Sequence, residues 1–255
     1  MPASNVHPFL DCPGGLLAFA HRGGAHDFPE NTMEAFEGAV NLGYRYIETD
    51  VHATSDGVLL AFHDDKLDRV TDKQGPIHQL TYDEVKQAKI NGTHEIPRFE
   101  ELLLAFSQIR INIDPKADTA VEPLVASLAA HDAFDRVCIG SFSDARLRHF
   151  RETFGTRICT SMGPLETARL RFGSWGLPTG QHLARCAQVP IKQSGIKIVD
   201  KRFCDHAHRK GLQAHVWTID DPQTMEHLIR TGVDGIMTDS PGLLKTVLQA
   251  HNLWA

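Results

Sequence analysis

Residues 46–63 read YIETDVHATSDGVLLAFH, and this stretch decides the fold. It holds two β-rich runs, 46–52 and 58–63, separated only by residues 53–57. Five residues are too few for a crossover between parallel strands, which takes a dozen or more. The pair Asp56-Gly57 instead favours a hairpin. The second run is therefore predicted to belong to an insertion that follows the first, and not to the parallel sheet.

Outward from this stretch, short β-rich runs alternate with helical stretches along the chain. Strands are predicted at 16–21, 46–52, 58–63, 110–113, 136–142, 157–162, 187–191, 212–219 and 234–239. Helical spacing is seen at 31–42, 99–107, 120–131, 144–154, 201–210, 223–231 and 241–251. This alternation is typical of right-handed βαβ units around a parallel sheet.

Without 58–63, eight βα units remain, which predicts an α/β fold, a TIM (β/α)8 barrel with a small hairpin-containing insertion after the second strand. We expect a single domain over 1–255, with the core at about 15–250 and the insertion at about 52–109. A doubly wound sheet is the alternative, because periodicity alone does not show closure.

The composition excludes several classes of partner. The formal net charge of −6 argues against nucleic acid or an anionic membrane as the main partner. The apolar runs are far shorter than a membrane span, so we expect no stable membrane insertion, and the N-terminus resembles no signal peptide. Five scattered cysteines without a CxxC pair predict reduced thiols and a cytoplasmic location. The sequence does not predict the oligomeric state.

Side chains with chemical potential stand at the ends of the first three predicted strands and of the hairpin. They are His21, Arg22, Glu48, Asp50, His63, Asp114 and Lys116. In a parallel barrel the carboxyl ends of the strands meet at one mouth, where functional groups gather. Each residue alone is an ordinary structural feature, but together they predict a site.

The carboxylates Glu48, Asp50 and Asp114 would repel one another at this mouth unless a cation lay between them. An all-oxygen ligand set suits one hard divalent cation, Mg²⁺ or Ca²⁺, and lacks the nitrogen and sulfur ligands of a typical zinc site. With Arg22 and Lys116 beside the ion, the site favours an anionic ester such as a phosphate.

The chain has no GxSxG nucleophile, and no cysteine lies at the predicted mouth. Two histidines with a metal ion instead fit phosphodiester cleavage by general acid–base catalysis, in which one imidazole takes a proton and the other gives one. The absence of a P-loop and of GxGxxG after a strand argues against a nucleotide cofactor.

The same residues resemble the glycerophosphodiester phosphodiesterase family, within the phosphatidylinositol-phospholipase-C-like TIM barrel superfamily. The matching motifs run in order over about 15–247 and include HRG at 21–23, PENT at 29–32, IETDV at 47–51, TSDG at 54–57, HD at 63–64, LDRVT at 67–71, VWT at 216–218 and GVDGIMTDSP at 232–241. The middle of the chain, about 120–210, matches in pattern only.

The resemblance implies hydrolysis of a small-molecule glycerophosphodiester to glycerol 3-phosphate and an alcohol, in lipid and glycerol metabolism. It implies attack by the glycerol 2-hydroxyl and a cyclic phosphate that water opens. By position, His21 and His63 match the catalytic pair, whereas Glu48, Asp50 and Asp114 match the metal ligands. Arg22 and Lys116 match the phosphate contacts.

One departure bears on the substrate: Asp114-Pro115-Lys116 stands where the family has Glu-x-Lys. Sphingomyelinase D-like phospholipases share this barrel and also tend to have aspartate there. The alternatives are therefore a phospholipase D-like enzyme acting on lysophospholipids or sphingomyelin, or a barrel that binds phosphoesters without catalysis.

Four further residues are assigned by their surroundings. Trp217, near a strand end, is expected to line the mouth and contact the substrate. His52 and His215 are interpreted as structural. Asp239 is interpreted as the N-cap of the last helix. A capping box formed by Asn31 and Glu34 is expected to open the first helix.

Overall fold

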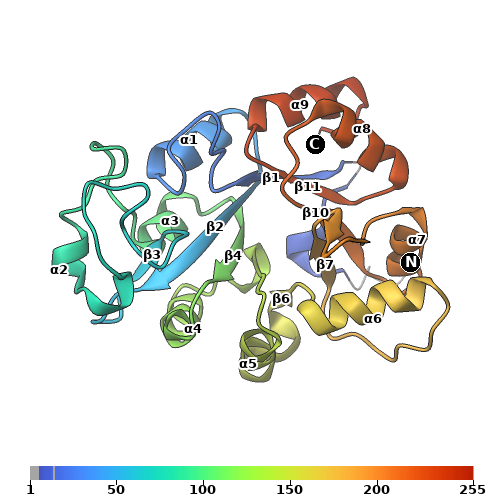
Figure 1. Cartoon of the computed structure of the whole chain (residues 1–255), viewed down its shortest axis with the longest axis horizontal. Coiled ribbons are helices and arrows are strands. Elements are labelled where there is room, and N and C mark those ends of the chain that lie inside the picture. Colours follow the sequence, from blue (N-terminus) through green and yellow to red (C-terminus); the bar gives the residue numbers. More distant parts are fainter. Residues whose placement is uncertain (1–5, 14, 255) are drawn as a thin grey trace.

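The computed structural model describes residues 6–13 and 15–254. The expectation about a signal peptide concerns the N-terminus, and residues 1–5 lie outside the described residues. Eight parallel strands form the barrel (Figure 1). They are β1 (Leu17–His21), β2 (Tyr46–Ala53), β4 (Arg110–Pro115), β5 (Val137–Ile139), β6 (Cys159–Thr160), β7 (Cys186–Val189), β10 (Gln213–Val216) and β11 (Gly235–Thr238).

Hydrogen bonds close the sheet into a ring. The strands follow the order β6-β5-β4-β2-β1-β11-β10-β7, so the first and last strands of the chain are neighbours. At the remaining seam, Ser161 pairs with Cys186 in a parallel bridge, and the Met162 N–H donates to the Cys186 carbonyl at 2.9 Å. The TIM barrel is thereby confirmed, and the doubly wound alternative is excluded.

Helices surround the barrel, one after most strands (Figure 1). They are α1 (Met33–Asn41), α3 (Phe99–Ala105), α4 (Val121–Ala130), α5 (Asp144–Phe154), α6 (Pro164–Ser174), α7 (Lys201–Arg209), α8 (Pro222–Thr231) and α9 (Pro241–Ala250). The sequence analysis gave no bounds for helix α6. It leaves Leu165 and Phe172 exposed while burying Leu170, so it lacks a clean apolar face.

The predicted hairpin is present. Strand β3 (Leu59–Ala61) runs antiparallel to β2, with Val51 opposite Ala61 and Ala53 opposite Leu59. The insertion continues through the short helices η2 (Ile77–Gln79) and α2 (Tyr82–Val85). It packs around its own apolar cluster of Leu60, Phe62, Leu67, Ile77, Val85, Ala88, Ile90 and Ile96. This separate small core gives the insertion a firm base from which it presents His63.

The remaining elements are short. They are the 3₁₀ turns η1 (Pro8–Leu10), η3 (Asp118–Ala120), η4 (Phe134–Arg136) and η5 (Gly155–Arg157), and the hairpin of β8 (Lys192–Gln193) with β9 (Ile196–Lys197). η1 packs Phe9 against Phe19 and Tyr46 inside the barrel, and the Tyr46 hydroxyl donates to the Phe9 carbonyl at 2.9 Å.

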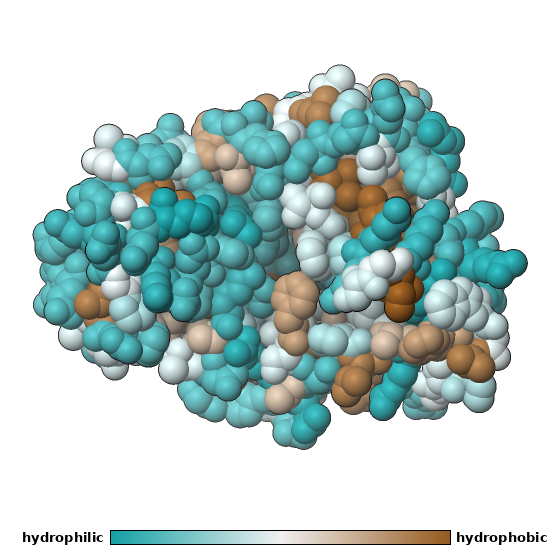
Figure 2. Space-filling view, in the orientation of Figure 1, coloured by the Kyte–Doolittle hydropathy of each residue, from teal (hydrophilic) through white to brown (hydrophobic). Residues whose placement is uncertain are grey.

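The surface is uneven in polarity. Figure 2 shows hydrophilic side chains over the insertion, whereas hydrophobic ones gather around α6 and β7. Exposed large apolar residues near α6 include Leu165, Trp175, Leu177 and Leu183. Over the part of the chain that the structure describes, no helix is both long and apolar enough to cross a membrane.

Candidate active site

One cavity at the carboxyl ends of the strands brings together all the side chains that the sequence predicted. Its lining includes His21, Arg22, Glu48, Asp50, His63, Asp114, Lys116 and Trp217. The register explains the convergence, because Asp50 of β2 lies directly beside Asp114 of β4, and His21 of β1 beside Glu48. Parallel pairing in register places the strand ends level with one another.

Lys116 joins two of the three carboxylates. Its Nζ lies 2.7 Å from Asp50 Oδ1 and 2.9 Å from Asp114 Oδ2. Burial opposes the charge on Lys116, but Asp50 and Asp114 outweigh it and raise the pKa of the ammonium. Burial also opposes ionisation of Asp50, yet Lys116 and Arg22 hold the pKa of that carboxyl below its usual value. At Asp114 burial wins and raises the pKa.

Glu48 lacks such a cation. Its Oε2 accepts a hydrogen bond from the Arg22 backbone N–H at 3.1 Å and lies 3.7 Å from His21 Nε2. Burial first, and then the charge of Asp50, raise the pKa of Glu48 to about 7. The side chains around Glu48 therefore carry too little positive charge to balance its carboxylate together with that of Asp50.

Arg22 occupies a tight turn after β1. Its φ of 52° is in the left-handed region, and Gly23 follows with φ 84°, where an added Cβ would lie 2.6 Å from the Ala35 Cβ. The guanidinium Nη1 donates to Glu30 Oε1 at 3.1 Å, and Nε lies 3.2 Å from Asp50 Oδ2. That buried Nε makes no well-aligned hydrogen bond, so its interaction with Asp50 is mainly electrostatic.

The first candidate imidazole is held by a residue that the sequence analysis misassigned. His21 Nδ1 lies 2.7 Å from Asp239 Oδ1. The N-cap of α9 is Ser240, so the interpretation of Asp239 as the N-cap was wrong. Burial alone would lower the pKa of His21, but Glu48 and Asp239 outweigh it and raise the pKa of the imidazole. Asp239 reaches His21 because β11 pairs with β1, with Thr238 opposite Ala20.

The second imidazole has a carboxylate partner of its own. His63 Nδ1 lies 2.6 Å from Asp64 Oδ1. The Arg69 guanidinium bonds Asp64 through Nε at 2.6 Å, and it also grips Glu30 through both terminal nitrogens. Hydrogen bonding from Arg69, followed by that from His63, lowers the pKa of Asp64 to about 2 despite partial burial. Glu30 and Arg69 thus link the insertion to the Arg22 turn.

A second correction concerns the start of α1. Thr32 is its N-cap, with Oγ1 accepting the Ala35 N–H at 3.1 Å. Asn31 instead has φ 56° and turns its amide toward β2. Its Oδ1 accepts from the Thr49 hydroxyl at 2.8 Å, and its Nδ2 donates to Asp50 Oδ2 at 3.4 Å. Asn31 therefore helps to orient a metal-candidate carboxylate.

Apolar side chains form the other half of the cavity. Phe142, Met162, Val189, Pro190 and Trp217 all line it. The rings of Phe142 and Trp217 meet edge to face at a centroid distance of 5.6 Å, and Phe142 is 59% exposed. Trp217 thus lies at the mouth, where it was expected.

Two further histidines, His52 and His215, lie on the barrel strands β2 and β10. His52 Nε2 lies 3.1 Å from the His63 carbonyl, and His215 is fully buried between Gln213 and Gln188. Both positions agree with their interpretation as structural residues.

The donor set fits a hard divalent cation. Glu48, Asp50 and Asp114 offer only oxygen atoms, and two of the three carboxyl groups have raised pKa values. Three carboxylates face two cations, the Lys116 ammonium and the Arg22 guanidinium, so one negative charge is left for a metal ion to balance. The group His26, Asp220 and Asp239 also brings potential ligand atoms within 4.8 Å of one another.

The closed barrel holds two imidazole–carboxylate pairs and a cluster of three carboxylates at one mouth. These features define a TIM-barrel enzyme of the phosphoric diester hydrolase class. The chain belongs to the glycerophosphoryl diester phosphodiesterase family, whose sequence model matches residues 21–243. The family resemblance and the expected class of enzyme are thereby confirmed.

Two curated relatives cover most of this chain. A probable glycerophosphodiester phosphodiesterase 2 of Mycobacterium tuberculosis is 37% identical over 250 residues, which span 94% of each protein. A human lysophospholipase D is 27% identical and covers 92% of this chain and 86% of its own length.

Solved structures share the fold. A putative glycerophosphoryl diester phosphodiesterase of Silicibacter pomeroyi superposes with a TM-score of 0.81 at 23% identity, covering 97% of this chain and 98% of its own. A phosphodiesterase of Oleispira antarctica, solved with the product sn-glycerol-3-phosphate, gives a TM-score of 0.78 at 22% identity and covers 92% and 97%.

Proposed function

We propose that the protein hydrolyses glycerophosphodiesters to glycerol 3-phosphate and an alcohol, with His21 and His63 as the proton-transfer groups and a bound divalent cation. The observation that carries the proposal is the cavity that both imidazoles share with Glu48, Asp50, Asp114 and Lys116. Family membership and the named relatives support the reaction. The arrangement of side chains supports the roles.

Glu48, Asp50 and Asp114 are the proposed ligands of Mg²⁺ or Ca²⁺. When bound, such an ion lowers the pKa of a coordinated hydroxyl and offsets the charge of the phosphoryl oxygens. The Asn31 side-chain amide donates a hydrogen bond to Asp50 Oδ2 and helps to orient that carboxylate. Arg22 and Lys116 are the proposed phosphate contacts, because both are cations that line the cavity.

Two proton transfers follow for the first step. One imidazole takes the proton of the glycerol 2-hydroxyl as its oxygen attacks phosphorus, and the other gives a proton to the departing alcohol oxygen. The product is a cyclic phosphate, which a water molecule opens with the two imidazoles in exchanged roles. Asp239 and Asp64 orient the rings from Nδ1, so that Nε2 of each remains free for this work.

Chelation tests the proposed cation. Dialysis against a strong chelator should abolish turnover of a glycerophosphodiester, and titration with Mg²⁺ or Ca²⁺ should restore it. Glu48→Gln should weaken metal binding. Glu100 is an exposed glutamate on α3, so Glu100→Gln is the matched control and should keep the metal affinity of the unsubstituted protein. Full activity in a rigorously metal-free sample would contradict the proposal.

A second substrate class has support from the apolar half of the cavity. Phe142, Met162 and Trp217 offer a surface for an acyl chain, and the human relative is named a lysophospholipase D. A panel of lysophospholipids and short-chain glycerophosphodiesters, assayed side by side, separates the two. Phe142→Ala should weaken turnover of the lysolipids selectively if the chain lies there.

The proposed subcellular location of the protein is the cytoplasm. The support is the odd number of scattered cysteines, which suits a reducing compartment. Fractionation of cells followed by immunodetection is the direct test.

A further inference from the structure

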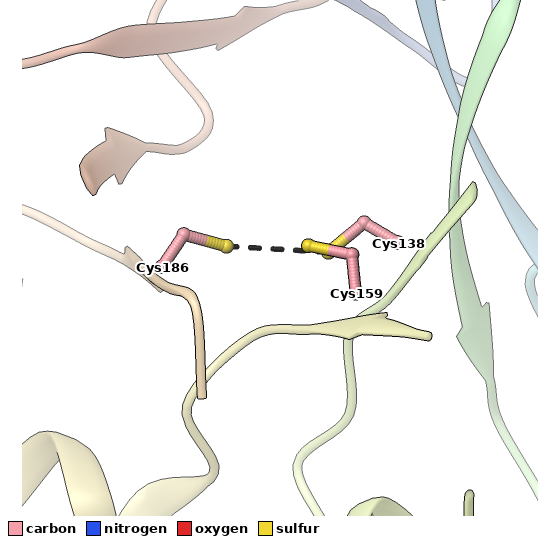
Figure 3. Close-up of side chains that lie close together, drawn as sticks. All are labelled: Cys138, Cys159 and Cys186. Carbon is pink, nitrogen blue, oxygen red and sulfur yellow. Dashed lines mark hydrogen bonds between the residues drawn. The ribbon is translucent and has the colours of Figure 1, made fainter. Parts of the chain in front are cut away.

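Three thiols meet inside the barrel, and none of them lines the catalytic cavity. Cys138, Cys159 and Cys186 come from β5, β6 and β7, and each is fully buried. Figure 3 shows the three side chains turned toward one another. A single buried cysteine is an ordinary small core residue. The convergence of three from consecutive strands is what sets this cluster apart.

The barrel register brings the thiols to one level. Cys138 lies directly opposite Cys159 in the parallel pairing of β5 and β6. Cys186 joins at the seam where β7 pairs with the end of β6. The surrounding cluster is apolar and includes Phe9, Phe19, Tyr46 and Met237. Water is thus kept from the sulfur atoms.

The sulfur atoms are spaced as ligands of one ion. The Cys138 and Cys186 Sγ atoms are 4.0 Å apart, and all three lie within 4.8 Å of one another. An ion bound at about 2.3 Å from three sulfurs in one plane requires those sulfurs to be about 4 Å apart. A disulfide would need about 2.05 Å. The Cys138–Cys186 spacing therefore suits two ligands of one trigonally coordinated ion.

The ligand set also limits which ion fits. Within the described chain, no fourth cysteine, histidine or carboxylate places a ligand atom within 4.8 Å of all three sulfurs. The His215 imidazole lies within hydrogen-bonding reach of Cys186, but its Nε2 engages Gln213 at 3.0 Å and its Nδ1 faces Gln188 at 3.4 Å. Zn²⁺ strongly prefers four ligands in structural sites. Sulfur ligands favour a soft ion, and Cu⁺ accepts three of them.

We propose that Cys138, Cys159 and Cys186 form a trigonal binding site for Cu⁺. Binding releases thiol protons as sulfur–copper bonds form and changes no oxidation state. The site is separate from the catalytic cavity and from the hard cation proposed there. Phe9 of η1 packs over the same cluster, so entry of the ion requires this N-terminal turn to open.

The test is anaerobic titration of the reduced, full-length protein with Cu⁺ against a chromophoric Cu⁺ chelator. We expect one equivalent to bind tightly. Cys138→Ala, Cys159→Ala and Cys186→Ala should each weaken binding by more than the roughly 10–100-fold cost of losing an outer-shell partner. Cys204→Ala, a buried thiol on α7, is the matched control and should bind as the unsubstituted protein does.

Two further measurements keep the result decisive. Hydrolase activity of each alanine variant reports that its barrel is folded. X-ray absorption of the Cu⁺-loaded unsubstituted protein should show three sulfur neighbours at about 2.3 Å. Binding that survives unchanged in all three variants, coordination by oxygen or nitrogen, or no bound copper would each overturn the proposal.

Discussion

His21 Nδ1 and Asp239 Oδ1 lie 2.7 Å apart, joined across the seam between the first and last barrel strands. This contact fixes which ring nitrogen of His21 faces the cavity, because Nδ1 carries the proton that the carboxylate accepts. A histidine so oriented can exchange a proton with substrate through Nε2 only. Closure of the barrel is therefore a condition for the chemistry and not only for stability.

Asp239→Asn should lower kcat while leaving the fold intact. Burial already opposes the charged imidazole, and Asp239 is one of the two carboxylates that overcome this, so its loss should lower the pKa of His21. The limb of the pH–rate profile that belongs to His21 should move to lower pH. An NMR titration of the ring protons measures the shift directly, and an unchanged His21 pKa in the variant would contradict the assigned role.

His21→Ala and His63→Ala should each lower kcat by roughly 10²–10⁴-fold, the usual contribution of a general acid or base. The double variant should cost little more than the worse single one, since groups that act as a unit are not additive. His78→Ala, on the surface of the insertion, is the matched control. Near-native kcat in His63→Ala would reduce that histidine to a structural role.

Glu48→Gln should stabilise the metal-free protein at neutral pH and weaken metal binding. An ordinary glutamate ionises near pH 4.5, whereas Glu48 in the folded protein has a pKa of about 7. Because the pKa of Glu48 is raised in the folded state, the contribution of this group to the free energy of unfolding is fully present below pH 4.5 and is lost as the pH rises through 7. The gain in Tm should therefore be large at pH 8 and small at pH 4. Thermal unfolding in chelator at both pH values measures it, and a lower Tm for the variant at pH 8 would contradict the prediction.

A substrate whose glycerol 2-hydroxyl is replaced by hydrogen should bind comparably but turn over far more slowly. The internal hydroxyl gains an effective molarity of up to about 10⁵–10⁸ M when it is well oriented. Equal kcat for the deoxy analogue would instead indicate direct attack by water. Simple dialkyl phosphates serve as a second set of poor substrates in the same assay.

Much of the site could be predicted because it follows from local pattern and one general rule. The i, i+2 spacing of Glu48 and Asp50 fixes their common face, and strand alternation places them at the mouth. Neither the pattern nor the rule predicts which residue pairs with His21, because Asp239 lies 218 residues away from it along the chain. Asn31 was misassigned because asparagine is equally suited to an N-cap and to a left-handed turn.

The missed features of the fold have similar causes. Helix α6 lacks a continuous apolar face, so periodicity alone gave no signal for it. The thiol cluster depends on the relative register of β5, β6 and β7, which no local pattern in the sequence encodes. Strand order and register follow from closure of the whole barrel.

The identity of the products tests the central claim most directly. Phosphorus NMR of glycerophosphocholine incubated with the protein and Mg²⁺ or Ca²⁺ should show glycerol 3-phosphate as the phosphorus-containing product, with a cyclic glycerophosphate early in the course. Phosphocholine in its place, or an unchanged substrate signal under both cations, would contradict the account.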